Sequence, residues 1–517
     1  MALFIPIFVL LIFSIAIQIL RRRGINLAQL WLISTIGVIV AWLSILFIFL
    51  LPDLVWKAPY LLTADNDKYS FIFFLDRSNW IFGFLLLSTL VSNLFTDAEQ
   101  FDNERMLLKW SSRMLIIGAG YVVILSGSTM TFLITSAILD LIIFGAEQII
   151  RSDNRNSLLD LCMRFAGTSL IFLGEGLGSD LKPFLLLSGL SIRLGVFNNI
   201  FLEPFGFISR QKSTPFIDMV LSLSTIFFIG QIIGVDGKFW GKVLLEIIVI
   251  VSVFLKCVGF IRNIKTGYGV RLWFEAFSGM VLLALLLGNT DLILPLGIVS
   301  CTWGAVLALD IIRTDKLKIA ILVLMLAMIG LPYTPTAGLW ITHEPGSATA
   351  IALIVNIFVL FLLLTGSKKI INMSETSLMQ DGWVSFSMGV GPLFLLVMPW
   401  ANILFGEKLG EFTFKYLWAG VFLLGSTLTL LADRNSKVRN LVLSFLRRIS
   451  PFLQFLKIIV NFFSLKWMRP FFSFIKQIVY GLIHIFNRAL EGDGGLLWAI
   501  LFLILISSIL VTYRLLI

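Results

Sequence analysis

The chain is poor in charge, cysteine and histidine, and each shortage excludes a class of protein. Only 14% of its 517 residues are Asp, Glu, Lys or Arg, whereas 58% are hydrophobic, a balance far from that of soluble globular proteins. Cys162, Cys257 and Cys301 form no Cys-x-x-Cys pair, and two histidines are too few for a histidine-rich metal site. No nucleotide, haem or iron–sulfur motif occurs. We therefore expect the chain to hold no metal and no cofactor.

The formal net charge of +10 does not indicate a nucleic-acid partner. Nucleic-acid binding requires basic residues that cluster on one face or in one domain. In this chain they are spread over the connections between long apolar stretches, where they meet anionic lipid headgroups. The lipid bilayer is therefore the expected surrounding.

Sixteen apolar stretches run through the chain, and most are close to the ~20 residues that a membrane-spanning helix needs. The charges of the first stretch follow it instead of preceding it, so we expect a retained anchor and not a secretory signal peptide. The sequence predicts an all-α fold, a polytopic membrane bundle of about 16 transmembrane helices. The stretches are 2–20, 28–51, 72–95, 110–126, 129–150, 158–174, 181–201, 216–234, 243–261, 271–288, 291–311, 317–339, 347–365, 382–405, 414–432 and 495–512.

Lysine and arginine alternate between rich and poor connections along the chain. If the connection after the first stretch faces the cytoplasm, cytoplasmic connections hold 28 of these residues and outer connections hold eight. Cytoplasmic loops retain basic residues. Both termini are therefore predicted on the extracytoplasmic side of a cell membrane, plasma or inner.

Three regions are expected along the chain. Residues 1–432 hold about 15 of the stretches and form the transmembrane core. Between 433 and 494, polar residues recur at steps of three and four opposite a phenylalanine-rich face, which predicts an amphipathic lateral helix on the cytoplasmic surface, bent at Pro451 and Pro470. A pair of re-entrant segments is the alternative for this region. Residues 495–517 form a C-terminal transmembrane anchor.

Ionisable residues inside apolar stretches are the candidates for function, because a charge at mid-bilayer costs about 2.5–3.5 kcal/mol. Those within stretches are Asp140, Arg164, Arg193, Glu246 and Lys256, and those closer to the ends are Glu147, Asp218, Glu275 and Asp310. Asp140 and Arg193 form the simplest acid–base pair. Glu147 shares a helix face with Asp140, since seven residues are about two turns. A purely structural ion pair between helices is the alternative interpretation of each.

Three segments resemble parts of the antiporter-like subunits of respiratory complex I and of the related Mrp-type cation/proton antiporters. FIFFLDRSNWIFGFLLL (71–87) resembles the segment in which an Asp precedes an early membrane helix. TMTFLITSAILDLIIF (129–144) resembles the fifth helix, with Asp140 at the position of a key Glu. LSIRLGVFNNIFLEP (190–204) resembles the broken seventh helix, with Arg193 at the position of a Lys.

Two further features support the same resemblance. MIGLPYTPTAGLWITHE (328–344) resembles the family's broken twelfth helix. The distal complex I member also adds a lateral amphipathic helix and a final span, to which the layout of 433–512 is similar. The resemblance implies other membrane subunits as partners and proton translocation along a mid-membrane chain of Glu and Lys. The candidates for such an ion pathway here are Asp140, Glu147, Arg193, Glu246, Lys256 and His343.

The chain departs from the family pattern where protons would pass. Arg193 cannot act as a proton-carrying Lys does, because a guanidinium is effectively never deprotonated in a protein. At the twelfth helix, Thr342 stands at the expected Lys, beside His343, and in the seventh helix Asn198 and Asn199 stand at the expected Pro. Where the eighth and eleventh helices usually carry Lys or His, this chain offers Ser222, Ser224, Thr225, Ser300, Cys301 and Thr302.

We therefore expect a divergent antiporter-like subunit of a larger complex, without catalytic activity of its own. It either takes part in proton or cation translocation or is a degenerate scaffold for it. One alternative is a stand-alone secondary transporter, since such proteins also use broken helices. The other is a multi-pass membrane enzyme acting on a lipid-linked sugar through the outer connection 52–79, whose candidate groups are Asp53, Asp65, Asp67, Asp76 and Arg77.

Overall fold

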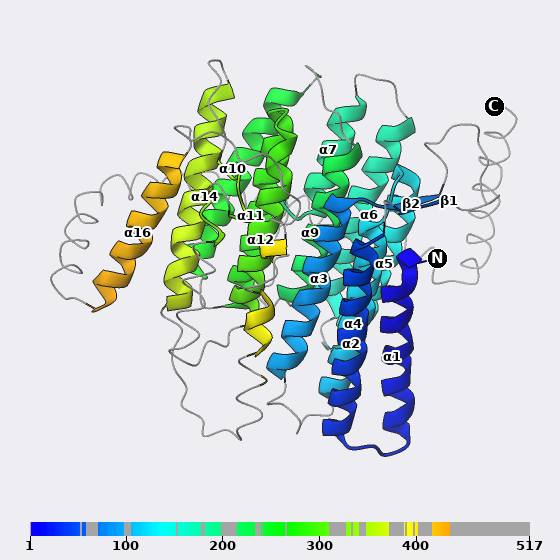
Figure 1. Ribbon diagram of the computed structural model, residues 1–517. Helices are drawn as coiled ribbons and strands as arrows, with labels where there is room; N and C mark the ends of the chain where they lie inside the picture. The colour runs from blue at the N-terminus through cyan, green and yellow to red at the C-terminus, as the bar shows by residue number, and fades with distance from the viewer. Residues whose placement is uncertain are drawn as a thin grey trace, which may run out of the picture. The chain divides into compact units, whose positions relative to one another are not determined.

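The computed structural model describes most of the chain up to residue 434. The described residues are 2–51, 54–57, 71–97, 105–150, 154–176, 181–197, 215–232, 239, 241–263, 266–309, 327–331, 334–340, 348–371, 387, 390–395, 399–401 and 416–434. Figure 1 shows the helices among them lying side by side.

The chain begins with two apolar helices that pack on each other, α1 (Ile5–Arg22, preceded by the 3₁₀ turn η1, Ala2–Phe4) and α2 (Leu27–Phe49). Two arginines in the last turn of α1 lie at the negative end of the helix dipole, where positive charge is favourable. Asn26 begins α2 by accepting a hydrogen bond from the N–H of Ala28 at 3.4 Å.

A short antiparallel hairpin, β1 (Leu54–Lys57) and β2 (Ile72–Leu75), precedes α3 (Arg77–Thr96). The predicted span 72–95 is therefore a strand for its first four residues. The reason is Asp76, whose side chain accepts a hydrogen bond from the N–H of Asn79 at 2.8 Å and so fixes the start of the helix. β2 is also bound on its other side, where the N–H of Phe74 donates to the carbonyl of Leu125.

The next four helices bring the candidate residues together. They pack in sequence, each on the next, and α4 also packs on α1. α7 is only 12 residues long, although the predicted span runs to residue 201. The four helices are α4 (Arg105–Ile124), α5 (Thr129–Ile150), α6 (Asn154–Gly176) and α7 (Lys182–Arg193).

The interior of the bundle is formed by α11 and α12, which contact α9, α10 and α14. Almost every residue of α11 is buried, whereas α1 exposes isoleucine, leucine and phenylalanine along one side. The helices are α9 (Pro215–Ile232), α10 (Lys242–Arg262), α11 (Gly267–Leu286), α12 (Ile293–Leu309, preceded by the 3₁₀ turn η4, Thr290–Leu292), α14 (Ala348–Ile371) and α16 (Tyr416–Arg434).

Residues 328–331 and 334–340 are non-helical turns in the segment that resembles the broken twelfth helix. Side chains of the same segment stabilise these turns. The hydroxyl of Thr336 donates to the carbonyl of Ala327 at 2.9 Å and accepts from the N–H of Gly330 at 3.0 Å. The indole of Trp340 donates to the carbonyl of Ile329 at 2.8 Å.

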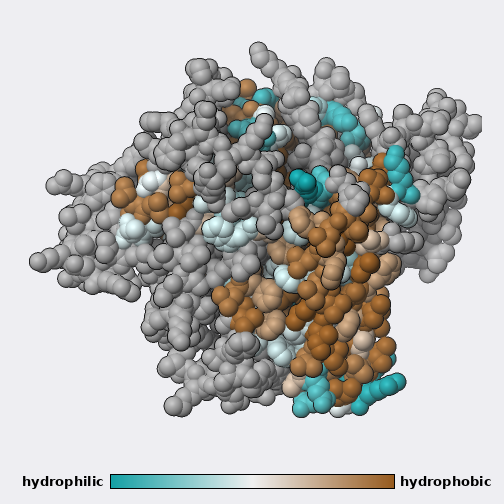
Figure 2. Space-filling model, viewed as in Figure 1, coloured by the Kyte–Doolittle hydropathy of each residue, from teal (hydrophilic) through white to brown (hydrophobic). Residues whose placement is uncertain are grey.

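Within the described residues, nine helices are long and apolar enough to cross a membrane: α1 to α6 and α10 to α12. Figure 2 shows apolar side chains covering the face over α1 and α2, with hydrophilic ones gathered at the end where these helices connect. The predicted all-α polytopic membrane fold is confirmed. The count of sixteen spans and the side on which the termini lie stay predictions. The lateral helix, from 435 on, and the anchor at 495–517 lie outside the described residues.

Candidate functional site

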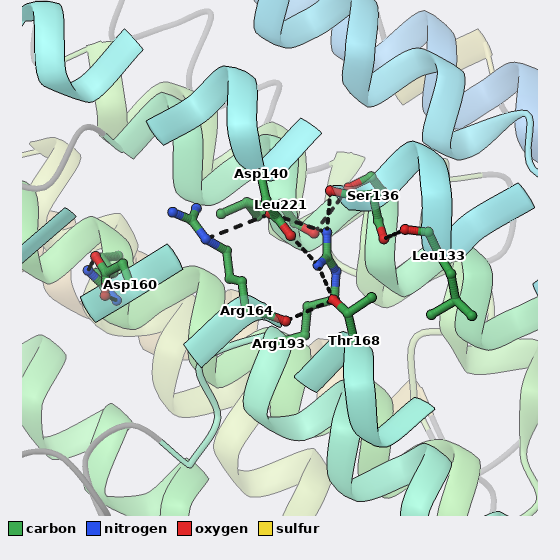
Figure 3. Close-up of polar contacts among 10 residues, drawn as sticks. Leu133, Ser136, Asp140, Asp160, Arg164, Thr168, Arg193 and Leu221 are labelled. Atoms are coloured by element: carbon green, nitrogen blue, oxygen red, sulfur yellow. Dashed lines mark hydrogen bonds and ion pairs between the residues drawn. The ribbon is translucent and has the colours of Figure 1, made fainter. Parts of the chain in front are cut away.

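A buried carboxylate, Asp140 on α5, lies between two arginines of neighbouring helices (Figure 3). Arg193, the last residue of α7, donates from Nη1 to Asp140 Oδ2 at 2.5 Å and from Nη2 to Oδ1 at 3.3 Å. Arg164 of α6 places its Nε 3.7 Å from Oδ1. The side chains of Asp140 and Arg193 are completely buried. The predicted pairing of Asp140 with Arg193 is confirmed, and these three residues are called the Asp140 group.

Three further residues fix the guanidinium of Arg193. Its Nη1 donates to the hydroxyl of Thr168 at 3.0 Å, and that hydroxyl donates to the carbonyl of Arg164 at 2.8 Å. Nη2 reaches the carbonyl of Ser136 at 3.4 Å. The ring of Phe132 faces the guanidinium carbon, 5.7 Å from the ring centre. Because a buried charge is stable only with such partners, Arg193 is held in one position.

α6 and α7 approach closely through two glycines. A Cβ at Gly167 would lie 2.6 Å from the carbonyl oxygen of Gly189, and a Cβ at Gly189 would lie 2.6 Å from that of Gly167. Small residues allow helix backbones to approach in this way in membranes. The same Cβ at Gly167 would lie 3.0 Å from the nitrogen of Arg193. The contact therefore brings Thr168, the next residue of α6, within reach of the guanidinium.

α7 ends at Arg193 because of a glycine and not a proline. Gly195 has a φ of +71°, a conformation that favours glycine. Its N–H donates to the carbonyl of Ile192 at 3.0 Å, and the N–H of Val196 donates to that of Ser191 at 2.9 Å. These two bonds form the Schellman motif that closes a helix. α7 therefore ends at Arg193, within the predicted span 181–201, and whether a helix resumes before residue 201 stays a prediction.

A second group of charges lies where α10 and α11 meet the end of α7. Lys256 on α10 is completely buried, forms an ion pair with Glu275 of α11 and donates to the carbonyl of Gly195 at 2.9 Å. Arg271, one turn earlier on α11, donates to Glu275 at 2.9 Å and to the carboxylate of Asp160 at 3.3 and 3.4 Å. The Lys256 group is Lys256, Glu275, Arg271, Asp160 and Asp218, whose Oδ1 lies 3.9 Å from Arg271 Nε.

A cavity of about 50 Å³ is lined by members of both groups and by Glu147. One water needs roughly 10–15 Å³ by this measure, so the cavity has room for a few. Among the described residues, three side chains beside the cavity have buried polar atoms without a hydrogen-bond partner. These atoms are Nε and Nη2 of Arg164, Nε of Arg193 and Oδ2 of Asp218. The size and polarity of the cavity therefore fit water.

No protein-family model and no curated protein matches the sequence, but solved structures match the fold. A chain of respiratory complex I from Thermus thermophilus with bound NADH has a TM-score of 0.56 at 14% identity, covering 82% of this chain and 100% of that one. A chain of the membrane-bound sulfane sulfur reductase, an archaeal respiratory membrane complex, has 0.59 at 12%, covering 98% and 100%. A chain of the Mrp complex from Dietzia sp. DQ12-45-1b has 0.62 at 11%, covering 99% of this chain and 63% of that one.

The chain has the antiporter-like subunit fold. The expected resemblance is therefore confirmed at the level of architecture, in a multi-pass membrane protein. Because the identities are only 11 to 14%, the likeness says nothing of which residues act. Function on a shared fold is decided by the site, so the function of this chain has to be inferred from its own side chains.

The other predicted pathway residues lie in different parts of this antiporter-like fold. Lys256 belongs to the second group, and Glu147 is buried and lines the cavity. Glu246 is partly exposed in the second turn of α10 and belongs to neither group. His343 lies outside the described residues.

The hydroxyls expected in place of Lys or His are buried in α9 and α12. Ser222 of α9 shares a hydrogen bond with Ser278 of α11 at 2.9 Å. Thr302 of α12 donates to a carbonyl of its own helix. The hydroxyls of Thr225 and Ser300 have no hydrogen-bond partner within the described part of the chain. At these positions the fold therefore offers buried hydroxyl groups and the thiol of Cys301, and neither Lys nor His.

Two residues of the Lys256 group are not identified from the sequence. Arg271 is the first residue of the predicted stretch 271–288 and counts there with the basic residues of the preceding connection, but the structure places it in the second turn of α11. Asp160 falls in the polar first turns of α6 and is not singled out. The spacing of Arg271 and Glu275 is the one available signal, because residues four apart on a helix are neighbours and opposite charges there attract.

Proposed function

We propose that this chain is a membrane subunit of a multi-subunit ion-translocating complex, in which the Asp140 group is a fixed block and not a proton carrier. Its fold resembles chains of three membrane complexes, two of them respiratory. The observation that carries the proposal is the position of Asp140, buried between Arg193 and Arg164.

The physical argument concerns what each side chain can exchange. Neither guanidinium loses its proton, so both positive charges are permanent. Asp140 binds Arg193 through both of its oxygens and also faces Arg164, so it serves as the fixed partner of these charges. A fixed positive charge at a helix break also repels cations, as arginines do in other pores. The chain alone is therefore expected to conduct neither protons nor sodium along this route.

Ion flux in proteoliposomes tests the proposal, under an imposed pH or sodium gradient. We expect the unmodified chain to show no flux above that of empty liposomes. Arg193→Lys introduces a base that can lose its proton, and the double variant Arg164→Gln/Arg193→Lys also removes the second permanent charge. Flux is expected to be larger in the double variant than in the single one. Arg262→Lys, an exposed position at the end of α10, is the matched control.

Robust gradient-driven flux by the unmodified chain contradicts the block and favours a stand-alone transporter. The enzyme hypothesis is not tested by this flux measurement, because it depends on the outer connection. There, Asp76 is the N-cap of α3 and holds the N–H of Asn79, a structural role. Asp53, Asp65 and Asp67 lie outside the described residues. No group of three or more His, Cys, Asp or Glu able to hold a metal occurs among the residues that the structure describes.

A further inference from the structure

The end of α7 is attached to α10 by side-chain hydrogen bonds. The Schellman motif satisfies the carbonyls of Ser191 and Ile192 and leaves the next carbonyls available. Lys256 Nζ donates to the carbonyl of Gly195 at 2.9 Å, and the hydroxyl of Ser252 donates to that of Val196. Ser252 and Lys256 are four residues apart and therefore lie on one face of α10.

The charge of Lys256 suits this position. The C-terminus of a helix carries partial negative charge on its free carbonyls, and a cation there is stabilising. Burying an ammonium is costly unless it is paired and hydrogen-bonded. Lys256 is completely buried and meets both conditions, with Glu275 on one side and Gly195 on the other.

The non-helical residues after α7 and those at 328–331 and 334–340 are stabilised in different ways. The turns at 328–331 and 334–340 are closed by their own side chains, Thr336 and Trp340. At the end of α7, residues 194–197 are Leu, Gly, Val and Phe, which have no polar side chain, and the side-chain donors come from α10. The course of the chain after the end of α7 therefore depends on another helix.

We propose that Lys256 and Ser252 are positioning residues that hold residues 194–197 in their non-helical course against α10. Arg193 is the last helical residue before this segment, so the same anchor sets where its guanidinium lies relative to Asp140. Lys256 thus connects the Lys256 group to the Asp140 group through the backbone of the break. The proposal deepens the proposed function and rests on it only in giving Arg193 a blocking role.

Hydrogen exchange of the full chain in lipid nanodiscs, read by mass spectrometry, tests the anchor. Lys256→Met/Glu275→Gln removes the cation without leaving its carboxylate charged and buried. We expect the amides of 194–196 to exchange about tenfold faster or more, because a hydrogen bond to a charged donor is lost. Lys256→Arg retains a cation with donors and is expected to stay much closer to the unmodified chain. Ser252→Ala should accelerate the same amides to a smaller degree, and Lys242→Met at the start of α10 should not.

A second measurement separates positioning from general stability. The interaction between Asp140 and Arg193 is measured by a double-mutant cycle, once in the unmodified background and once in Lys256→Met/Glu275→Gln. The anchor requires this interaction to weaken in that background and to persist in Lys256→Arg. Unchanged exchange at 194–196, equal acceleration in all helices, or an unchanged interaction each overturns the proposal. The flux experiment can fail without affecting these outcomes, so the two proposals are tested separately.

Discussion

The Asp140 group and the Lys256 group use similar side chains in different balance. In the first, one carboxylate meets two guanidiniums, and the carboxylate and Arg193 are completely buried. In the second, a lysine and an arginine meet three carboxylates. The side chains of Arg271 and Asp160 are 23% and 31% exposed. The pair of Asp140 and Arg193 is therefore closed, whereas the second group is partly exposed.

This difference shows what each group can do. A closed group of permanent charges can join helices, and here it joins α5, α6 and α7. The second group contains the one completely buried lysine of the described residues, and lysine, unlike arginine, is able to lose its proton in a protein. The same fold thus places an arginine–aspartate pair beside a group that contains a buried lysine.

The largest expected effect comes from removing one carboxylate charge in each group and comparing the losses in stability. Asp140→Asn leaves two buried guanidiniums without their carboxylate and should lower the free energy of unfolding by about 3–5 kcal/mol. Asp160→Asn removes a partly exposed partner and should cost about 0–1 kcal/mol. Chemical unfolding in detergent measures both. Asp140→Asn/Arg193→Gln should cost less than the sum of its single changes, and additive losses would contradict the pairing.

The contact between α6 and α7 is the next test. Gly167→Ala places a methyl group against the backbone of Gly189 and of Arg193, so the two helices must separate. We expect a loss of about 1–3 kcal/mol in unfolding free energy, as for overpacking elsewhere. Gly145→Ala on α5 is the matched control, because among the described residues no atom beyond its chain neighbours and its own helix backbone lies within 4 Å of the position that its methyl group would take. It should be neutral or stabilising by about 0.5–1 kcal/mol. Equal losses in the two variants would show that the close approach is not required.

The fold was predictable where hydrophobic length decides it and less so where a single residue does. The length of α1, α2, α5 and α10 follows from long apolar runs between basic residues. The end of α7 does not, because the apolar run continues and only the conformation of Gly195 closes the helix. The strand at Ile72–Leu75 was likewise not predicted, because its residues are as apolar as those of the helix after it.

Electrostatics made part of the candidate site predictable from the sequence. Asp140 and Arg193 are predicted as a pair because charges within apolar stretches need partners. Arg164 lies in a stretch too, but one carboxylate between two guanidiniums follows only from the packing of α6 on α7. Arg271 and Asp160 lie near helix ends, where sequence does not distinguish a buried charge from a solvated one.

The smallest expected effect concerns how tightly Arg193 is held. The hydroxyl of Thr168 joins Arg193 to the backbone of Arg164, and Thr168→Val removes it at nearly constant shape. Arg193 keeps both bonds to Asp140, so the loss in unfolding free energy should be only about 0.6–1.5 kcal/mol, the range of single hydrogen bonds in membrane proteins. Thr89→Val on α3 is the matched control, because that buried hydroxyl donates to the carbonyl of Leu86 in its own helix. Thr89→Val should cost less than Thr168→Val. If Thr168→Val costs as little as the control, Asp140 alone fixes the guanidinium. The difference between the Asp140 group and the Lys256 group then depends on their carboxylates and not on the hydroxyl of Thr168.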